Sequence, residues 1–127
     1  MRMTKEELPV LIEDGPASVR ATDWAGHKAI YVALPGGFDL TPLVEGLPDD
    51  RCQASLWGYM LKGKMRVIYT DGTEETIGAG DLYYMAPGKT VIVEEDAELV
   101  QFGPPEAYDE TIEAILRNAE AAAAQTS

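Results

Sequence analysis

The chain has 127 residues, of which 46% are hydrophobic and 25% are charged. This length and composition are typical of one compact domain, leave no room for a second, and argue against a largely disordered chain. Twenty-two acidic residues against ten basic ones give a net charge of -12. Nucleic acid and anionic membranes are therefore poor partners, because most of the surface would repel them.

The cysteine content and the start of the chain predict the compartment. The single cysteine, Cys52, excludes an internal disulfide and any zinc site built from several thiolates. Residues 1–7 are polar, and no window approaches the roughly 18 consecutive apolar residues that a membrane span needs. We therefore expect neither a signal peptide nor a transmembrane helix, and a cytoplasmic protein.

Short runs with β-strand patterning, separated by turn residues, fill the chain from about residue 17 to 103. Ala25-Gly26 predicts a tight connection, and Asp71-Gly72 predicts a hairpin with a primed turn. Residues 35–50 are rich in Pro, Gly and acidic residues and predict a structured loop that packs against the sheet. This rhythm favours a barrel or a sandwich, with strands at 19–24, 28–34, 53–61, 64–70, 74–77, 81–85, 90–93 and 99–102.

The composition changes after Gly103-Pro104-Pro105, and residues 106–123 predict an amphipathic helix. Its narrow apolar stripe is expected to lie on the barrel or on a partner and consists of Ile112, Ile115, Leu116 and Ala119. Near the start of the chain, Thr4 and Glu7 have the spacing of a capping box for one helical turn.

Residues 50–102 carry a combination of turns that resembles the second half of a cupin. The hairpin Tyr59-Met60-Leu61-Lys62-Gly63 leads to the charged turn at Asp71-Gly72, and Gly80-Asp81 is followed by Pro87-Gly88. The resemblance implies an all-β fold, the cupin-type double-stranded β-helix or jelly-roll barrel, with a C-terminal α-helix. We expect residues 1–127 to form one such domain.

Cupins usually hold a metal with three histidines and a carboxylate, and the resemblance places those ligands at Asp50, Cys52, Leu56 and Val91. Some small one-domain cupins carry Cys-x-Cys-Pro-His-Trp-Gly-Tyr and Gly-His-Thr, where this chain has residues 52–59 and Gly88-Lys89-Thr90. At most two of the four positions can bind a metal. We therefore predict no metal and no cofactor; a divalent transition metal is the alternative.

Alternation along a strand places Cys52, Ala54, Leu56 and Met60 on one face and Trp57, Tyr59 and Leu61 on the other. If the metal positions of the family point into the barrel, this inner wall is small and apolar, which suits an organic ligand. A tyrosine hydroxyl could orient such a ligand. The predicted pocket residues are Cys52, Ala54, Leu56, Met60, Tyr84 and Val91.

Other chemically capable residues have simpler interpretations. His27, the only histidine, is expected at the surface, and Cys52 is expected to be a buried structural thiol, because Arg51 is the only basic residue beside it in sequence. Asp50 is expected in water, since burial without a cation would be costly. Residues 94–96 are interpreted as turn or edge charges.

Three functions remain open, because function belongs to the site rather than to the barrel. The first is a metal-independent pocket that binds a small organic molecule. The second is a cupin enzyme, an isomerase, cyclase or dioxygenase, that uses a non-standard metal site with Cys52 and Asp50 or a tyrosine as acid. The third is a non-catalytic subunit that binds another protein. We also expect a homodimer, with Trp57, Tyr59 and Leu61 facing a partner or the N-terminal segment.

Overall fold

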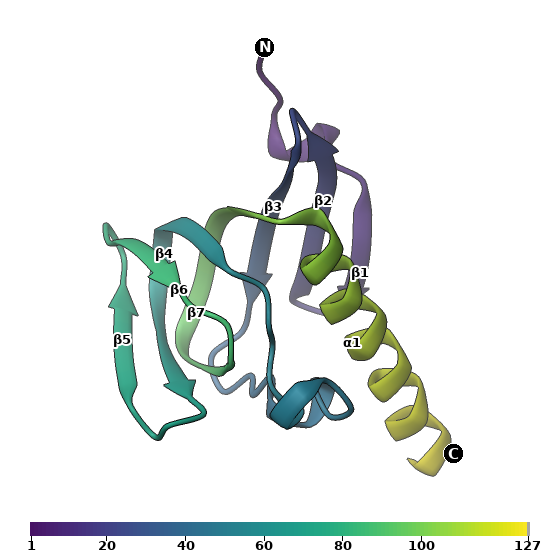
Figure 1. Ribbon diagram of the computed structural model, residues 1–127. Helices are drawn as coiled ribbons and strands as arrows, with labels where there is room; N and C mark the ends of the chain where they lie inside the picture. The colour runs from purple at the N-terminus through teal and green to yellow at the C-terminus, as the bar shows by residue number, and fades with distance from the viewer. Residues whose placement is uncertain (127) are drawn as a thin grey trace.

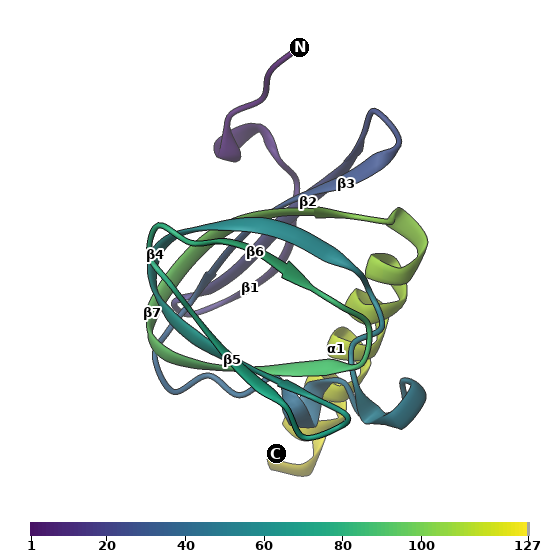
Figure 2. The same cartoon turned by 60° about the vertical axis from the view of Figure 1, so that its left-hand side comes forward.

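The computed structural model describes residues 1–126 and shows a rolled antiparallel sheet with one helix packed beside it (Figure 1). Viewed from the side, the strands curl around a central space, and the helix lies along one end (Figure 2). This confirms the predicted all-β barrel with a C-terminal helix. The strands are β1 (Val10–Asp14), β2 (Ala17–Trp24), β3 (His27–Leu34), β4 (Leu56–Tyr69), β5 (Glu74–Gly78), β6 (Leu82–Met85) and β7 (Lys89–Gly103).

The two long strands β4 and β7 form the centre of the sheet. Their antiparallel pairing runs from Trp57 opposite Phe102 to Tyr69 opposite Lys89. The sheet order is β1-β2-β3-β7-β4-β5, and β6 pairs with the first part of β4. β4 therefore also pairs with β5 and β6, whereas β7 pairs with β3, which is followed in the sheet by β2 and β1.

The strand prediction was wrong in three places. β1 was not predicted, so the sheet begins at Val10 rather than near residue 17; β1 pairs with β2 across a register shift. β4 continues through the predicted break near Gly63, with register shifts against β7. β7 continues through residues 94–96, which are exposed strand residues rather than a turn. Glu94 and Glu95 face outward there and form ion pairs with Arg66 and Lys64 of β4, respectively.

One of the two predicted tight turns has the expected geometry. Ala25 and Gly26 both have positive φ, 52° and 85°, and connect the paired residues Trp24 and His27. The second hairpin forms, but its turn is not primed: only Gly72 has positive φ, and the Asp71 carboxylate accepts hydrogen bonds from the Thr73 amide (2.9 Å) and hydroxyl (2.7 Å). The aspartate side chain stabilises an alternative turn that the dipeptide pattern does not distinguish.

A short 3-10 helix, η1 (Lys5–Glu7), precedes β1, and two more, η2 (Thr41–Leu43) and η3 (Pro48–Asp50), lie between β3 and β4. The capping-box prediction was wrong, because the Thr4 side chain makes no cap hydrogen bond. Asp50 is exposed, as expected, and accepts a hydrogen bond from the Gly46 amide (2.9 Å).

The C-terminal helix α1 spans Pro105–Thr126, with proline at the position where a missing amide costs least. Tyr108, Thr111 and Ile112 are buried against the barrel, but Leu116, which the stripe included, is 46% exposed. The Asn118 amide donates hydrogen bonds to the carbonyls of Leu43 and Glu45, both at 2.8 Å. These bonds attach the loop around η2 to the helix. Within residues 1–126, no helix has both the length and the hydropathy to cross a membrane.

The predicted division of β4 into two faces is confirmed. Ala54, Leu56 and Met60 are at most 4% exposed, whereas Trp57 and Leu61 are about half exposed. Exposed apolar side chains from β6 and β7 adjoin them, and we call this set the outer apolar face; it comprises Trp57, Tyr59, Leu61, Leu82, Tyr84 and Phe102.

Gly63 is the glycine on which the close approach of β4 and β7 depends. It has φ +83°, and a Cβ there would collide with the Asp96 carbonyl oxygen. Gly72 has a similar φ of +89° and open space around it. We predict that Gly63→Ala lowers the free energy of unfolding by about 3 kcal/mol or more, whereas the control Gly72→Ala costs about 1 kcal/mol. Urea unfolding of both variants measures this, and equal losses would contradict the prediction.

Candidate functional site

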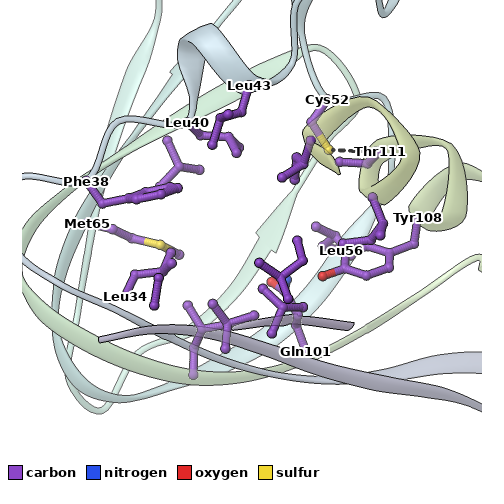
Figure 3. Close-up of a pocket in the computed structure, with 18 of the residues that line it drawn as sticks. Leu34, Phe38, Leu40, Leu43, Cys52, Leu56, Met65, Gln101, Tyr108 and Thr111 are labelled. Atoms are coloured by element: carbon purple, nitrogen blue, oxygen red, sulfur yellow. Dashed lines mark hydrogen bonds between the residues drawn. The ribbon is translucent and has the colours of Figure 1, made fainter. Parts of the chain in front are cut away.

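A cavity of about 190 Å³ opens between the inner faces of the strands, the loop before η2 and the helix α1. Figure 3 shows Phe38, Leu40 and Leu43 on one side of it, with Tyr108 and Thr111 of α1 on another. Most of its surface is apolar. The polar side chains along it are few: Asp14, Ser18, Cys52, Lys89, Gln101, Tyr108 and Thr111.

The structure brings three of the six predicted pocket residues to the cavity wall. Cys52, Leu56 and Val91 line it. Ala54 and Met60 are completely buried in the core without lining the cavity. Placing Tyr84 in the pocket was wrong: it is 45% exposed on the outer apolar face, where its ring lies 4.9 Å from that of Trp57. Alternation explains this, since Tyr83, its neighbour in β6, is the inward-facing residue.

Cys52 and Lys89 form a cross-strand pair at one end of the cavity. The Cys52 amide donates to the Lys89 carbonyl (2.9 Å), and the Lys89 amide donates back to the Cys52 carbonyl (3.2 Å). Directly opposed residues of this kind hold their Cβ atoms about 5 Å apart. The backbone therefore places the two side chains next to each other, so that a basic residue other than its sequence neighbour Arg51 adjoins the cysteine in space.

A hydrogen-bonded chain extends from this pair to the helix. The Thr111 hydroxyl donates to the Ala107 carbonyl (3.0 Å), so its oxygen is left to accept from the Cys52 thiol, 3.5 Å away. The Lys89 amine donates to the Ala54 carbonyl, and the neighbouring Cys52 thiol acts on the pKa of that amine.

Lys89 is 1% exposed, and burial lowers the pKa of its amine, an effect only partly offset by the Cys52 thiol. Lys28, a second lysine that is only 7% exposed, lies between Asp23 and Asp109 at 2.7 and 2.8 Å. Burial lowers the pKa of Lys28 too, but these two carboxylates raise it by more, so its pKa is raised overall. In the described part of the chain, no carboxylate forms an ion pair with Lys89.

Two buried phenols complete the polar groups near the cavity. The Tyr83 hydroxyl donates to Gln101 Oε1 at 2.6 Å. Burial raises the pKa of Tyr83 and that of Tyr108, so both stay protonated at neutral pH. They can donate a hydrogen bond but are poor proton donors in a reaction.

No protein-family model matches the sequence, and no curated protein is similar to it. The fold, in contrast, has many solved relatives. A protein of unknown function from Rhizobium leguminosarum superposes with a TM-score of 0.60 at 21% identity, over 82% of this chain and 95% of its own. An RmlC-like cupin from Shewanella frigidimarina gives 0.57 at 15% identity, over 81% and 88%. The chain has the cupin fold.

Oxalate decarboxylase from Bacillus subtilis is also similar, with a TM-score of 0.57 at 19% identity over 80% of this chain. This cupin-fold chain spans only 28% of that enzyme's length. At such identities the likeness shows the fold alone.

The residues of this cupin fold do not suit the metal that the family usually binds. Of the four positions implied by the resemblance, Leu56 and Val91 have no donor atom, and Asp50 is an exposed turn residue that binds the Gly46 amide. Cys52 is the remaining donor. Within the described residues, no three side chains of His, Cys, Asp or Glu gather where they could hold a metal ion.

Sequence reasoning missed Lys89, although a signal was present. Lys89 stands where similar small cupins have the histidine of Gly-His-Thr, and Cys52 stands at one of the other ligand positions. Positions 52 and 89, which lie opposite each other in this structure, therefore both have side chains that can react. The sequence assigned this lysine no role, and only its register opposite Cys52 places it inside.

The two buried lysines should give opposite pH dependences of stability. Because the pKa of Lys89 lies below its ordinary value of 10.5 in the folded state, the unfolded chain binds the extra proton between the two values, and stability rises with pH there. Lys28, with its raised pKa, stabilises fully below 10.5 and loses this contribution above it.

We therefore predict that the stability of the wild type relative to Lys89→Met rises as the pH approaches 10.5. Relative to Lys28→Met, wild-type stability should stay level to that pH and then fall. Urea unfolding across the alkaline range measures both differences, and parallel curves for the wild type and Lys89→Met would contradict the assignment.

Proposed function

We propose that this chain binds a small, largely apolar organic molecule in the cavity beside α1, without a metal. The observation that carries the proposal is the cavity itself: an apolar wall with a few converging polar groups is the usual form of a small-molecule site. Cys52, Leu56 and Val91, predicted from sequence, contribute to that wall.

The cavity volume limits the ligand to a small molecule. An apolar cavity of about 150 Å³ takes up benzene in another protein, and this one is about 190 Å³. A substituted benzene or a short branched chain matches that volume. The polar groups at the Lys89 end suit one hydrogen-bonding group on an otherwise apolar ligand.

A binding role is better supported than either enzymatic alternative. The metal route needs Asp50 beside Cys52, and Asp50 instead lies exposed in η3. The tyrosine route needs a phenol that gives up its proton near neutral pH, whereas burial raises the pKa of both Tyr83 and Tyr108. We therefore favour a sensor or carrier of a small molecule.

Filling the cavity tests the proposal. We predict that toluene raises the thermal midpoint of the wild type and that Val91→Phe, which places a ring in the cavity, abolishes this shift. Val100→Phe is the matched control, because Val100 is on the same strand but not on the cavity wall, and it should keep the shift. No stabilisation of the wild type by toluene or by other benzene-sized molecules would refute the proposal.

We also propose that the outer apolar face is buried against a second copy of the chain. Trp57 lies opposite Tyr84 of β6 and Phe102 of β7, and Tyr59 lies opposite Leu82, so the exposed side chains are contiguous across three strands. Contiguous apolar patches on a protein surface mark interaction sites. At the border, Lys62 pairs in register with Glu98, and a face that carries both signs can complement itself across a two-fold axis.

Introducing a charge into the outer apolar face tests the dimer. Leu82, the first residue of β6, is 83% exposed, so Leu82→Lys should convert a dimer to a monomer in light scattering while the circular dichroism spectrum stays that of the folded wild type. Leu116→Lys on α1 is the control, because Leu116 is exposed outside the patch, and it should leave the mass unchanged. A monomeric wild type at micromolar concentration would contradict the proposal.

A further inference from the structure

The surroundings of the Lys89 amine favour its neutral form. A neutral amine has two N–H donors and one lone pair, whereas an ammonium group has three donors and no lone pair. Within the described residues, the Lys89 amine donates to the Ala54 carbonyl and stands beside the Cys52 thiol, which lies opposite it in register. As an ammonium it would hold a buried charge that no carboxylate of the described residues pairs with, and such a charge is costly.

Lys28 is a buried lysine of the same chain whose surroundings favour the charged form. It is buried almost as deeply, and two carboxylates hold its ammonium within 2.8 Å. Lys89 instead lies on the wall of an apolar cavity, with a thiol and a carbonyl as neighbours. A lysine desolvated in an apolar pocket is the usual form of a nucleophilic amine.

We propose that Lys89 is a nucleophile that forms an imine with a small apolar aldehyde or ketone bound in the cavity. The inference rests on the proposed function, because the cavity must first admit such a molecule, and it names the ligand's polar group as a carbonyl. A neutral carbonyl compound also avoids the repulsion that a chain of net charge -12 exerts on an anionic ligand.

The chemistry balances without an oxidant or reductant. The Lys89 nitrogen lone pair forms a bond to the carbonyl carbon, and the π pair of the C=O bond moves to oxygen. The two protons of the amine then pass to that oxygen, which leaves as water, and a C=N bond remains. The Cys52 thiol, opposite Lys89 in register and hydrogen-bonded to Thr111, is placed to relay a proton.

Reductive trapping tests the proposal on the whole chain. The protein is incubated with benzaldehyde and cyanoborohydride near neutral pH, which replaces one hydrogen of an imine-forming amine by a benzyl group, and peptide mass spectrometry then locates the adduct. The chain has five lysines, so Lys5, Lys28, Lys62 and Lys64 serve as internal controls. We expect Lys89 to be labelled at least about tenfold faster than Lys28.

Three variants sharpen the result. Lys89→Met should lose the adduct while keeping the toluene-induced thermal shift. Val91→Phe should protect Lys89 by filling the cavity, and Val100→Phe should not. Labelling that is spread evenly over the lysines, or that is unchanged in Val91→Phe, would overturn the inference.

The toluene and benzaldehyde measurements separate the two proposals. If toluene stabilises the wild type but Lys89 is not labelled, the imine is refuted and the binding function stands. If benzoate stabilises the wild type and not Lys89→Met while no adduct forms, the lysine binds a carboxylate and the imine is again refuted. If no probe binds or reacts at the cavity, both proposals fail.

Discussion

The pairing of β4 with β7 is the constraint on which the rest of the structure depends. The two strands have 14 and 15 residues, and all other strands join the sheet through them. β5 and β6 pair with β4, and β3, followed by β2 and β1, pairs with β7. The register shifts near Gly63 bend the pair without breaking it. The same pairing ends at Tyr69 and Lys89, and the first residue of β7 is thereby placed opposite Cys52 at the end of the cavity.

The cavity exists because two separate parts of the chain, the loop around η2 and the helix α1, cover the inner face of the sheet incompletely. The loop around η2 is held to α1 by the two hydrogen bonds from Asn118, and α1 is held to the barrel by Tyr108 and Ile112. Space remains between them and the strands. The wall of the cavity is apolar, so its dielectric constant is low. The polar groups of Lys89, Cys52 and Thr111 therefore interact more strongly with a bound ligand than they would in water.

The two buried lysines show how position rather than residue type sets chemistry. Lys28 and Lys89 are both nearly inaccessible to solvent, yet the pKa of one is raised and that of the other is lowered. The difference comes from the partners: Asp23 and Asp109 compensate the desolvation of Lys28, and no carboxylate among residues 1–126 pairs with Lys89. The sequence alone does not distinguish the two lysines. Lys28 meets Asp109, and Lys89 meets Cys52, only when α1 and the strands have packed together.

The local sequence pattern determined which strand residues face inward and where the barrel gives way to a helix. Alternation sorted Leu56 and Met60 inward and Trp57 and Leu61 outward, because successive residues of a strand face opposite sides. The turn residues and the helical period of residues 106–123 predicted a barrel followed by a helix, since each depends on neighbours in sequence.

Tertiary structure decided the rest. β1 forms because β2 offers it an edge, and β7 runs through three acidic residues because β4 pairs with it and offers Lys64 and Arg66 as ion-pair partners. The candidate site is also a product of tertiary structure. Cys52 and Lys89 are 37 positions apart in the sequence, and their contact depends on the register of strands that only the completed sheet fixes.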